Sequence, residues 1–262
     1  MENLSLNVEP EKDYSSGEED EFNLIETEAV ELNNLESLEN DYLLVGIYGN
    51  GSAFLKASLF KEMRSNTNSY KLKFMVKSQK DQSRAKKIIA ELYQFTYNNR
   101  TNLVLHTKQN FSDQSYDYVL EYLKSKNLKY SKVVVFDSNH KSELILSEIF
   151  ENLYSLKNSV QLKSNQLIKP KNFPAPNTIG GFSAYLITYY EVFEIPCVVY
   201  VAVSNLYEVC LESISSFNGC SVTYPFFREK LSEDYFKNEL ISLASIRSLF
   251  KEYNSYKNLV YS

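Results

Sequence analysis

The feature that most constrains the fold is a set of short, continuously apolar runs. The clearest is Cys197 to Val203, and Leu43 to Tyr48 and Val133 to Phe136 are of the same kind. A strand that is apolar on both faces must be covered on both sides, which is typical of a parallel sheet flanked by helices. The run from Cys197 has seven residues, far short of the roughly 20 that a membrane-spanning helix needs. We therefore expect buried strands and no membrane partner.

The segments between these runs show mostly helical spacing of apolar residues. Two more strands are expected at Tyr70 to Val76 and Leu103 to Leu105. Alternation of strands and helices predicts an α/β fold, a single domain with a mostly parallel central sheet and helices on both faces. The expected helices are a stretch capped by Ser52, Ser83 to Tyr97, Tyr116 to Leu123, Leu144 to Tyr154, a stretch capped by Asn177 or Thr178 that Pro196 stops, and a last long helix from Ser232.

The charge distribution divides the chain into three parts. Residues 1–40 hold 13 Asp or Glu and one Lys, a net charge of −12, whereas the other 222 residues hold 20 acidic and 27 basic side chains, a net charge of +7. An acidic segment with few aromatic residues favours disorder, although part of Leu24 to Leu38 could form a weak helix. We expect a disordered segment at 1–40, the α/β domain at 41–250 and a flexible tail at 251–262.

The basic body leaves two interpretations open. An ordinary domain with a solvated acidic tail explains the numbers, and so does a basic surface that meets an acidic partner. Nucleic acid is one such partner, but the lysines are scattered and no RNP-like or zinc-finger pattern accompanies them. We therefore expect no nucleic-acid partner.

The cysteines indicate the compartment. Cys197, Cys210 and Cys220 are an odd number without metal-ligand spacing, so reduced thiols are the simplest interpretation. The acidic N-terminus does not resemble a secretory signal. We expect a cytoplasmic protein, with the nucleus as a second location, and neither a metal nor another cofactor.

Two strand-end segments are the candidates for chemistry. Gly46-x-x-Gly49-x-Gly51-Ser52 follows a strand and opens a helix, where a phosphate could bind, but the spacing matches neither dinucleotide-binding nor P-loop motifs. Asp137-Ser138-Asn139-His140 follows another strand, at the position where α/β enzymes place catalytic groups. An α/β enzyme that binds a phosphate-containing small molecule at these ends is the alternative hypothesis. The main expectation is that the chain has no catalytic residues.

The C-terminus is the candidate partner-binding segment. Leu259, Val260, Tyr261 and Ser262 end the chain after a polar spacer, so that two aliphatic side chains and a tyrosine precede the free carboxylate. A terminal carboxylate is a chemical handle that protein pockets capture, and the tyrosine supplies a rigid ring with a hydroxyl.

Three segments resemble a known family. The ending Val260-Tyr261-Ser262 looks like the hydrophobic-tyrosine-any motif of proteasome activators and assembly chaperones. Pro176 to Val201 resembles the C-terminal core of the proteasome assembly chaperone 1 family, in which a Pro-Asn step leads a helix and an Ile-Pro step leads a strand. Tyr42 to Phe54 resembles that family's first strand and turn, whereas about 60 to 165 has no clear counterpart.

The resemblance implies a function. Such chaperones pair with a second, related chaperone, and the heterodimer promotes formation of the ring of α subunits in the proteasome core particle. The tail would enter a pocket between adjacent α subunits, with its carboxylate near a lysine, Tyr261 against the pocket wall and Val260 in an apolar niche. The motif leaves the side chain of Ser262 open.

Overall fold

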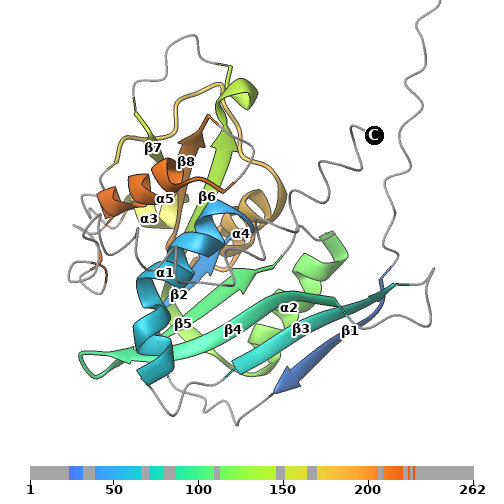
Figure 1. Cartoon of the computed structure of the whole chain (residues 1–262). Helices are drawn as coiled ribbons and strands as arrows, with labels where there is room; N and C mark the ends of the chain where they lie inside the picture. The colour runs from blue at the N-terminus through green and yellow to red at the C-terminus, as the bar shows by residue number, and fades with distance from the viewer. Residues whose placement is uncertain are drawn as a thin grey trace, which may run out of the picture.

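The fold, described by a computed structural model, is built on one mixed β-sheet of eight strands (Figure 1). The structure describes residues 24–31, 39–65, 71–78, 87–108, 113–145, 151–163, 170–205, 209–220, 224 and 227. The strands are β1 Leu24–Glu31, β2 Glu39–Gly46, β3 Lys71–Ser78, β4 Lys87–Tyr97, β5 Arg100–Thr107, β6 Lys129–His140, β7 Leu153–Lys157 and β8 Cys197–Ser204. The helices are α1 Asn50–Ser65, α2 Asp113–Ser125, α3 Ser159–Lys163, α4 Gly181–Val192 and α5 Leu211–Ser216, with short 3-10 turns η1 Lys141–Glu143 and η2 Phe217–Cys220.

The strand order is β1-β3-β4-β5-β2-β6-β8-β7. The central strands β5, β2, β6 and β8 are parallel, and the strands outside them pair antiparallel. The predicted α/β class is confirmed. The predicted mostly parallel sheet is only partly right. The continuously apolar runs identify the parallel strands at the centre of the sheet but do not predict the antiparallel strands outside them.

The predicted helix at Ser83 to Tyr97 is wrong, because Lys87–Tyr97 is strand β4. In its register with β3, Phe74 faces Ala90 and Met75 faces Ile88, so Ile89 is an extra residue in a bulge. A bulge places neighbouring residues on one face, and Ile89 and Ala90 indeed lie in the same core layer. The bulge, together with apolar side chains on both faces of β4, where Leu92 and Phe95 lie in opposite core layers, explains the helix-like spacing.

Two other segments also differ from the prediction. Leu153–Lys157, at the end of the expected helix from Leu144, is the edge strand β7 and pairs with β8; residues 146–150 lie outside the described part. Leu24–Glu31, expected to be disordered or weakly helical, is strand β1 and pairs with β3. Both strands depend on a distant partner strand, which local sequence does not reveal. The division into domains at 41 and 250 stays a prediction.

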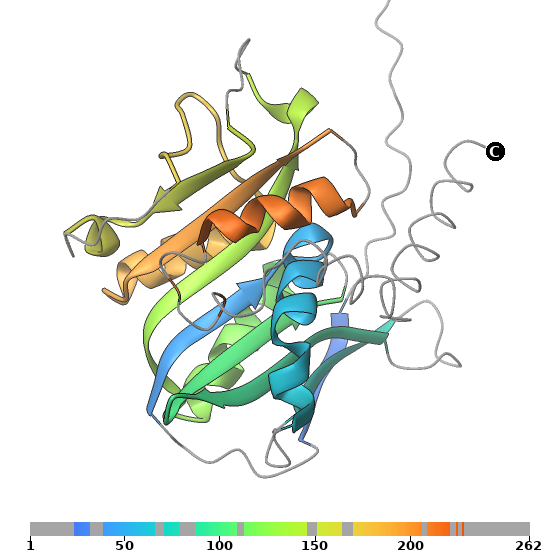
Figure 2. The same cartoon turned by 60° about the vertical axis from the view of Figure 1, so that its left-hand side comes forward.

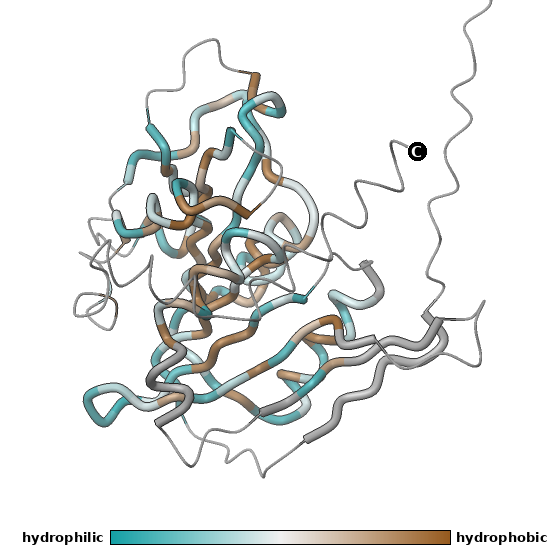
Figure 3. The backbone as a smooth tube through the Cα atoms, viewed as in Figure 1, coloured by the Kyte–Doolittle hydropathy of each residue, from teal (hydrophilic) through white to brown (hydrophobic). Residues whose placement is uncertain are grey.

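Helices cover both faces of the sheet, as predicted. Figure 2 shows α1 and α5 on one side and α2 and α4 on the other. Side chains alternate between the two layers along β8: Val199 and Val201 pack with α2 and α4, whereas Val198 and Tyr200 pack with α1 and α5. The most apolar stretches of the chain run through the middle of the molecule (Figure 3). Among the helices of the described part, none combines the length and apolar character that crossing a membrane requires.

Candidate functional site

The predicted partner-binding residues Leu259, Val260, Tyr261 and Ser262 lie outside the described residues, as does the expected helix from Ser232. Their docking role stays a prediction. The described part does bring together the two strand-end segments that were candidates for chemistry. They meet at the carboxyl ends of the parallel strands β5, β2 and β6, the edge at which α/β proteins bind ligands.

The glycine turn after β2 is shaped by close packing. A side chain on Gly51 would place its Cβ 1.9 Å from the carbonyl oxygen of Phe136 in β6, so only glycine fits at this crossing of α1 over β6. Gly49 has a φ of 101°, a conformation that favours glycine. The amide of Ser52 donates to the oxygen of Ile47 at 2.7 Å. These contacts explain the glycines without a bound phosphate.

The first residue of α1 ties this turn to two other elements. Asn50 donates from Nδ2 to Ser138 Oγ at 3.1 Å, and its Oδ1 accepts the amide of Cys210 at 2.9 Å. The expected cap Ser52 is not the start of the helix, which begins at Asn50. The Ser52 hydroxyl instead faces His106, 3.3 Å from its Nδ1.

Asp137 and His140, at the two ends of this segment, have different hydrogen-bond partners. Asp137 accepts hydrogen bonds from Ser183 Oγ at 2.6 Å and from the amide of Ser138 at 2.7 Å. Burial raises the pKa of the Asp137 carboxyl, and the two hydrogen bonds oppose this shift. His140 caps η1, where its Nδ1 accepts the amide of Ser142. The two residues therefore do not converge on a common reacting centre.

Asp137 links strand β6 to the start of α4. Its partner Ser183 lies in the first turn of α4, whose N-cap is Gly180 rather than the expected Asn177 or Thr178.

A cleft of about 520 Å³ opens at this edge of the sheet. Its described lining contains the carboxylates Asp137 and Glu143 and neither lysine nor arginine. A site for a phosphate group needs donors and positive charge, so this cleft does not suit the phosphate-containing ligand of the alternative hypothesis. The lining residues are Ile47, Thr107, Tyr116, Asp137, Asn139, Glu143, Thr178, Gly180, Gly181 and Phe182.

A buried polar cluster lies beside the glycine turn. His106 Nε2 lies 3.1 Å from Glu91 Oε2, which also binds Lys108 Nζ at 2.9 Å and accepts from Tyr93 OH at 2.8 Å. The Tyr93 ring stacks on His106 with centroids 5.4 Å apart. We call Ser52, Glu91, Tyr93, His106 and Lys108 the His106 cluster. The role of Glu91 was not predicted, because the sequence pattern placed that residue on a helix, whereas it lies in strand β4.

The charges of the His106 cluster follow from burial and pairing. Burial lowers the pKa of His106 to about 4, against the opposing effect of Glu91. Burial alone would raise the pKa of Glu91, but its contacts with His106 and Lys108 lower it well below the ordinary value. Glu91 is thus charged and His106 neutral near pH 7. Nε2 lies next to the carboxylate, and Nδ1 lies next to the Ser52 hydroxyl.

This Ser-His-Glu order resembles a catalytic triad in composition only. In the triad of serine hydrolases Nε2 faces the serine and Nδ1 the carboxylate, whereas here the two nitrogens are exchanged. Ser52 and His106 are each 1% exposed, so a substrate has no access to the hydroxyl. The cluster joins α1, β4 and β5 inside the protein.

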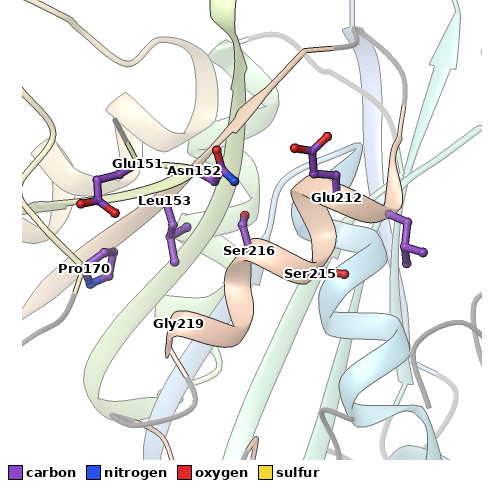
Figure 4. Close-up of a pocket in the computed structure, with 9 residues that line it drawn as sticks. Glu151, Asn152, Leu153, Pro170, Glu212, Ser215, Ser216 and Gly219 are labelled. Carbon is purple, nitrogen blue, oxygen red and sulfur yellow. The ribbon is translucent and has the colours of Figure 1, made fainter. Parts of the chain in front are cut away.

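A second hollow, of about 760 Å³, lies between the start of β7 and helix α5 (Figure 4). Figure 4 shows Glu151 and Pro170 on one side and Glu212 of α5 on the other. Glu151 pairs with Lys171 at 2.8 Å. The described lining contains no basic side chain and is not built to hold an anion. The lining residues are Glu151, Asn152, Leu153, Pro170, Leu211, Glu212, Ser215, Ser216 and Gly219.

The described residues contain no group of three or more His, Cys, Asp or Glu that could hold a metal ion. The three thiols are free. Cys197 is fully buried in the layer beneath α2 and α4, which confirms its predicted place in the core.

Comparison with known proteins gives matches in structure. No protein-family model and no curated protein matches the sequence. Pyrococcus furiosus PbaA, an archaeal homolog of proteasome-assembly chaperone, matches with a TM-score of 0.58 at 14% identity, over 88% of this chain and 100% of that chain. PbaB, an archaeal proteasome activator of the same organism, matches with a TM-score of 0.58 at 10% identity, over 86% and 99%.

A third match is a protein of unknown function from Thermoplasma acidophilum, with a TM-score of 0.53 at 13% identity, over 83% of this chain and 90% of that chain. At such identities the likeness is one of fold. This chain therefore has the fold of an archaeal proteasome-assembly chaperone homolog and of an archaeal proteasome activator.

Proposed function

We propose that this chain is a proteasome assembly chaperone that acts by binding other proteins. The observation that carries the proposal is the shared fold over the whole length of PbaA, an archaeal homolog of proteasome-assembly chaperone. The sequence resemblance of Pro176 to Val201 supports it separately. That resemblance implies a helix followed by a strand, and the segment forms α4 and then β8.

The proposed partners are the α subunits of the proteasome core particle and a second, related chaperone. The chain and this second chaperone form a heterodimer that promotes assembly of the α ring. We place this activity in the cytoplasm and the nucleus. The fold of PbaA and the ending Val260-Tyr261-Ser262 support these partners together.

The proposed docking element is the segment Leu259, Val260, Tyr261 and Ser262. Its carboxylate binds a lysine between two adjacent α subunits, and the Tyr261 ring packs on the pocket wall. A buried aromatic anchor of this kind carries a large share of binding energy.

Two side chains of the strand-end segments are held by contacts within the protein. Asp137 accepts a hydrogen bond from Ser183, and Ser52 lies buried beside His106.

Replacing Tyr261 by Ala is expected to weaken binding to α subunits by about 2 kcal/mol, or about thirtyfold in Kd, because the aromatic anchor is lost. Binding is weakened rather than abolished, since the rest of the chaperone also contacts the ring. Titration of immobilised α subunits with the full-length chain measures the change.

Tyr256→Ala is the matched control, because it removes the same side chain from the same segment outside the terminal motif. It should bind like the parent. Equal recovery of α subunits by the parent and by a chain lacking residues 260–262 would exclude docking through the tail. Absence of any binding by the parent would exclude the chaperone function itself.

A further inference from the structure

The cleft of about 520 Å³ lies at the carboxyl ends of two parallel strands whose following helices cover opposite faces of the sheet. Strand β2 is followed by α1 on one face, and β5 is followed by α2 on the other (Figure 2). Ile47, just after β2, and Thr107, the last residue of β5, both line the cleft. Such a switch point is the usual place of a ligand site in open α/β sheets, and the volume is in the range of small-molecule sites.

The lining of the cleft favours a positive charge. Asp137 and Glu143 are its two carboxylates, and its described residues include neither lysine nor arginine. Among the described charged groups, only Glu143 shifts the pKa of Asp137, and it raises that pKa in the same direction as burial does. The Asp137 carboxyl therefore has no basic partner in the described part of the chain, whereas buried carboxylates are normally paired. A cation in the cleft would be attracted by both carboxylates.

The Asp137 carboxyl can accept further hydrogen bonds. Its Oδ1 accepts the amide of Ser138, and its Oδ2 accepts the Ser183 hydroxyl. A carboxylate offers about four acceptor positions, so that one remains on each oxygen. Asn139 and Thr178 add side-chain oxygens to the same lining. An ammonium group, which has three N–H donors and no acceptor, matches this set of acceptors.

The rest of the cleft includes an apolar wall. The rings of Tyr116 in α2 and Phe182 in α4 stack with centroids 4.7 Å apart, and both rings line the cleft together with Ile47. In small-molecule sites such a wall holds the carbon part of a ligand, while a few polar groups fix its orientation. An inorganic cation has no carbon part that could use this wall, so the lining fits an organic cation better.

We propose that this cleft binds an alkyl ammonium group, with its nitrogen at Asp137 and Glu143 and its carbon chain against Tyr116 and Phe182. Two sources offer this chemistry, namely a free amine and a lysine side chain of another protein. The inference comes from the lining of the cleft and does not rest on the chaperone function. Binding of an amine and binding of α subunits are separate measurements, so that either can fail without the other.

The experiment is isothermal titration calorimetry of the full-length chain with putrescine and, separately, with Nα-acetyl-lysine amide. Butane-1,4-diol is the matched control ligand, because it has the carbon chain of putrescine with hydroxyls in place of the ammonium groups. We expect saturable binding of the amines and none of the diol. Tighter binding of putrescine would identify a free amine as the source, and tighter binding of the lysine derivative would identify a protein side chain.

Substitution of the two carboxylates locates the bound group. Asp137→Asn should weaken binding by about tenfold, because it removes a charged acceptor and keeps an oxygen for Ser183. Glu143→Gln should weaken it by about threefold, since Glu143 is exposed and solvent screens its attraction. Glu212→Gln is the matched control: it removes an exposed carboxylate from the other hollow and should bind like the parent.

Thermal unfolding of each variant separates loss of binding from loss of folding. If Asp137→Asn does not fold, Glu143→Gln still tests the proposal, because it changes an exposed side chain of the turn η1. Three outcomes would overturn the proposal. They are the absence of saturable binding by either amine, equal binding of the diol, and an equal effect of Glu143→Gln and Glu212→Gln.

Discussion

Gly51→Ala is expected to lower the free energy of unfolding by about 3 kcal/mol. The added Cβ would lie 1.9 Å from the carbonyl oxygen of Phe136 and 2.6 Å from its carbon. Both atoms belong to the backbone of the central strand β6, which cannot rotate away as a flexible side chain could. Helix α1 would have to move off the sheet, and Phe54 would lose part of its contacts with Phe136 and Phe217, whose centroids are 5.0 Å away.

Urea denaturation of the two purified chains measures this loss. Gly180→Ala is the matched control, because no atom lies within 4 Å of the added Cβ and the backbone there is extended, with a φ of −121°. We expect it to stay within about 1 kcal/mol of the parent, since any effect on the N-cap of α4 is small. Equal effects of the two substitutions would show that close approach to β6 is not the reason for Gly51.

The close contact that requires Gly51 could not be predicted from the local sequence. The pattern of glycines after β2 is visible in the sequence, and it suggested both a plain turn and a phosphate site. The deciding contact joins Gly51 to Phe136, 85 positions later, and exists only once β2 and β6 are neighbours. Proximity of this kind is a property of topology rather than of any local pattern.

The same distinction separates the strands that could be predicted from those that could not. Strands β2, β6 and β8 are buried on both faces. Each of them is therefore an uninterrupted apolar run, which can be recognised in the sequence. Strands β1 and β7 lie at the sheet edges, where pairing with one neighbour decides the structure. Strand β4 was obscured by the bulge at Ile89, which breaks the alternation of its side chains.

For the candidate site, single residues were predictable and their partners were not. The position of Asp137 at a strand end follows from the apolar run before it. Its engagement by Ser183 does not, because α4 is 46 residues away in sequence. Because of that contact, the Asp137 carboxyl, a candidate catalytic group in the sequence, helps to hold the first turn of α4 in place. Glu91 remained unseen for a related reason, since the carboxylate reaches His106 only when β4 is a strand beside β5.

Acidification from pH 7 to pH 4 is expected to lower the free energy of unfolding by roughly 3 kcal/mol through His106 alone. Burial holds the pKa of His106 at about 4 in the folded protein, against an ordinary value of 6.5. Between these two pH values His106 is protonated in the unfolded chain but neutral in the folded protein. The free energy of unfolding therefore falls by about 1.4 kcal/mol for each pH unit of acidification. The loss begins near pH 6.5 and ends near pH 4. Glu91 adds a further loss below its ordinary pKa of 4.5, because its folded pKa is lowered.

Urea denaturation at a series of pH values measures this dependence of the free energy of unfolding on pH. His106→Gln should flatten it between pH 6.5 and 4.5, whereas His140→Gln, which removes the chain's other histidine, should leave the slope in place. A slope that survives His106→Gln would mean that the buried imidazole is not the group that senses pH.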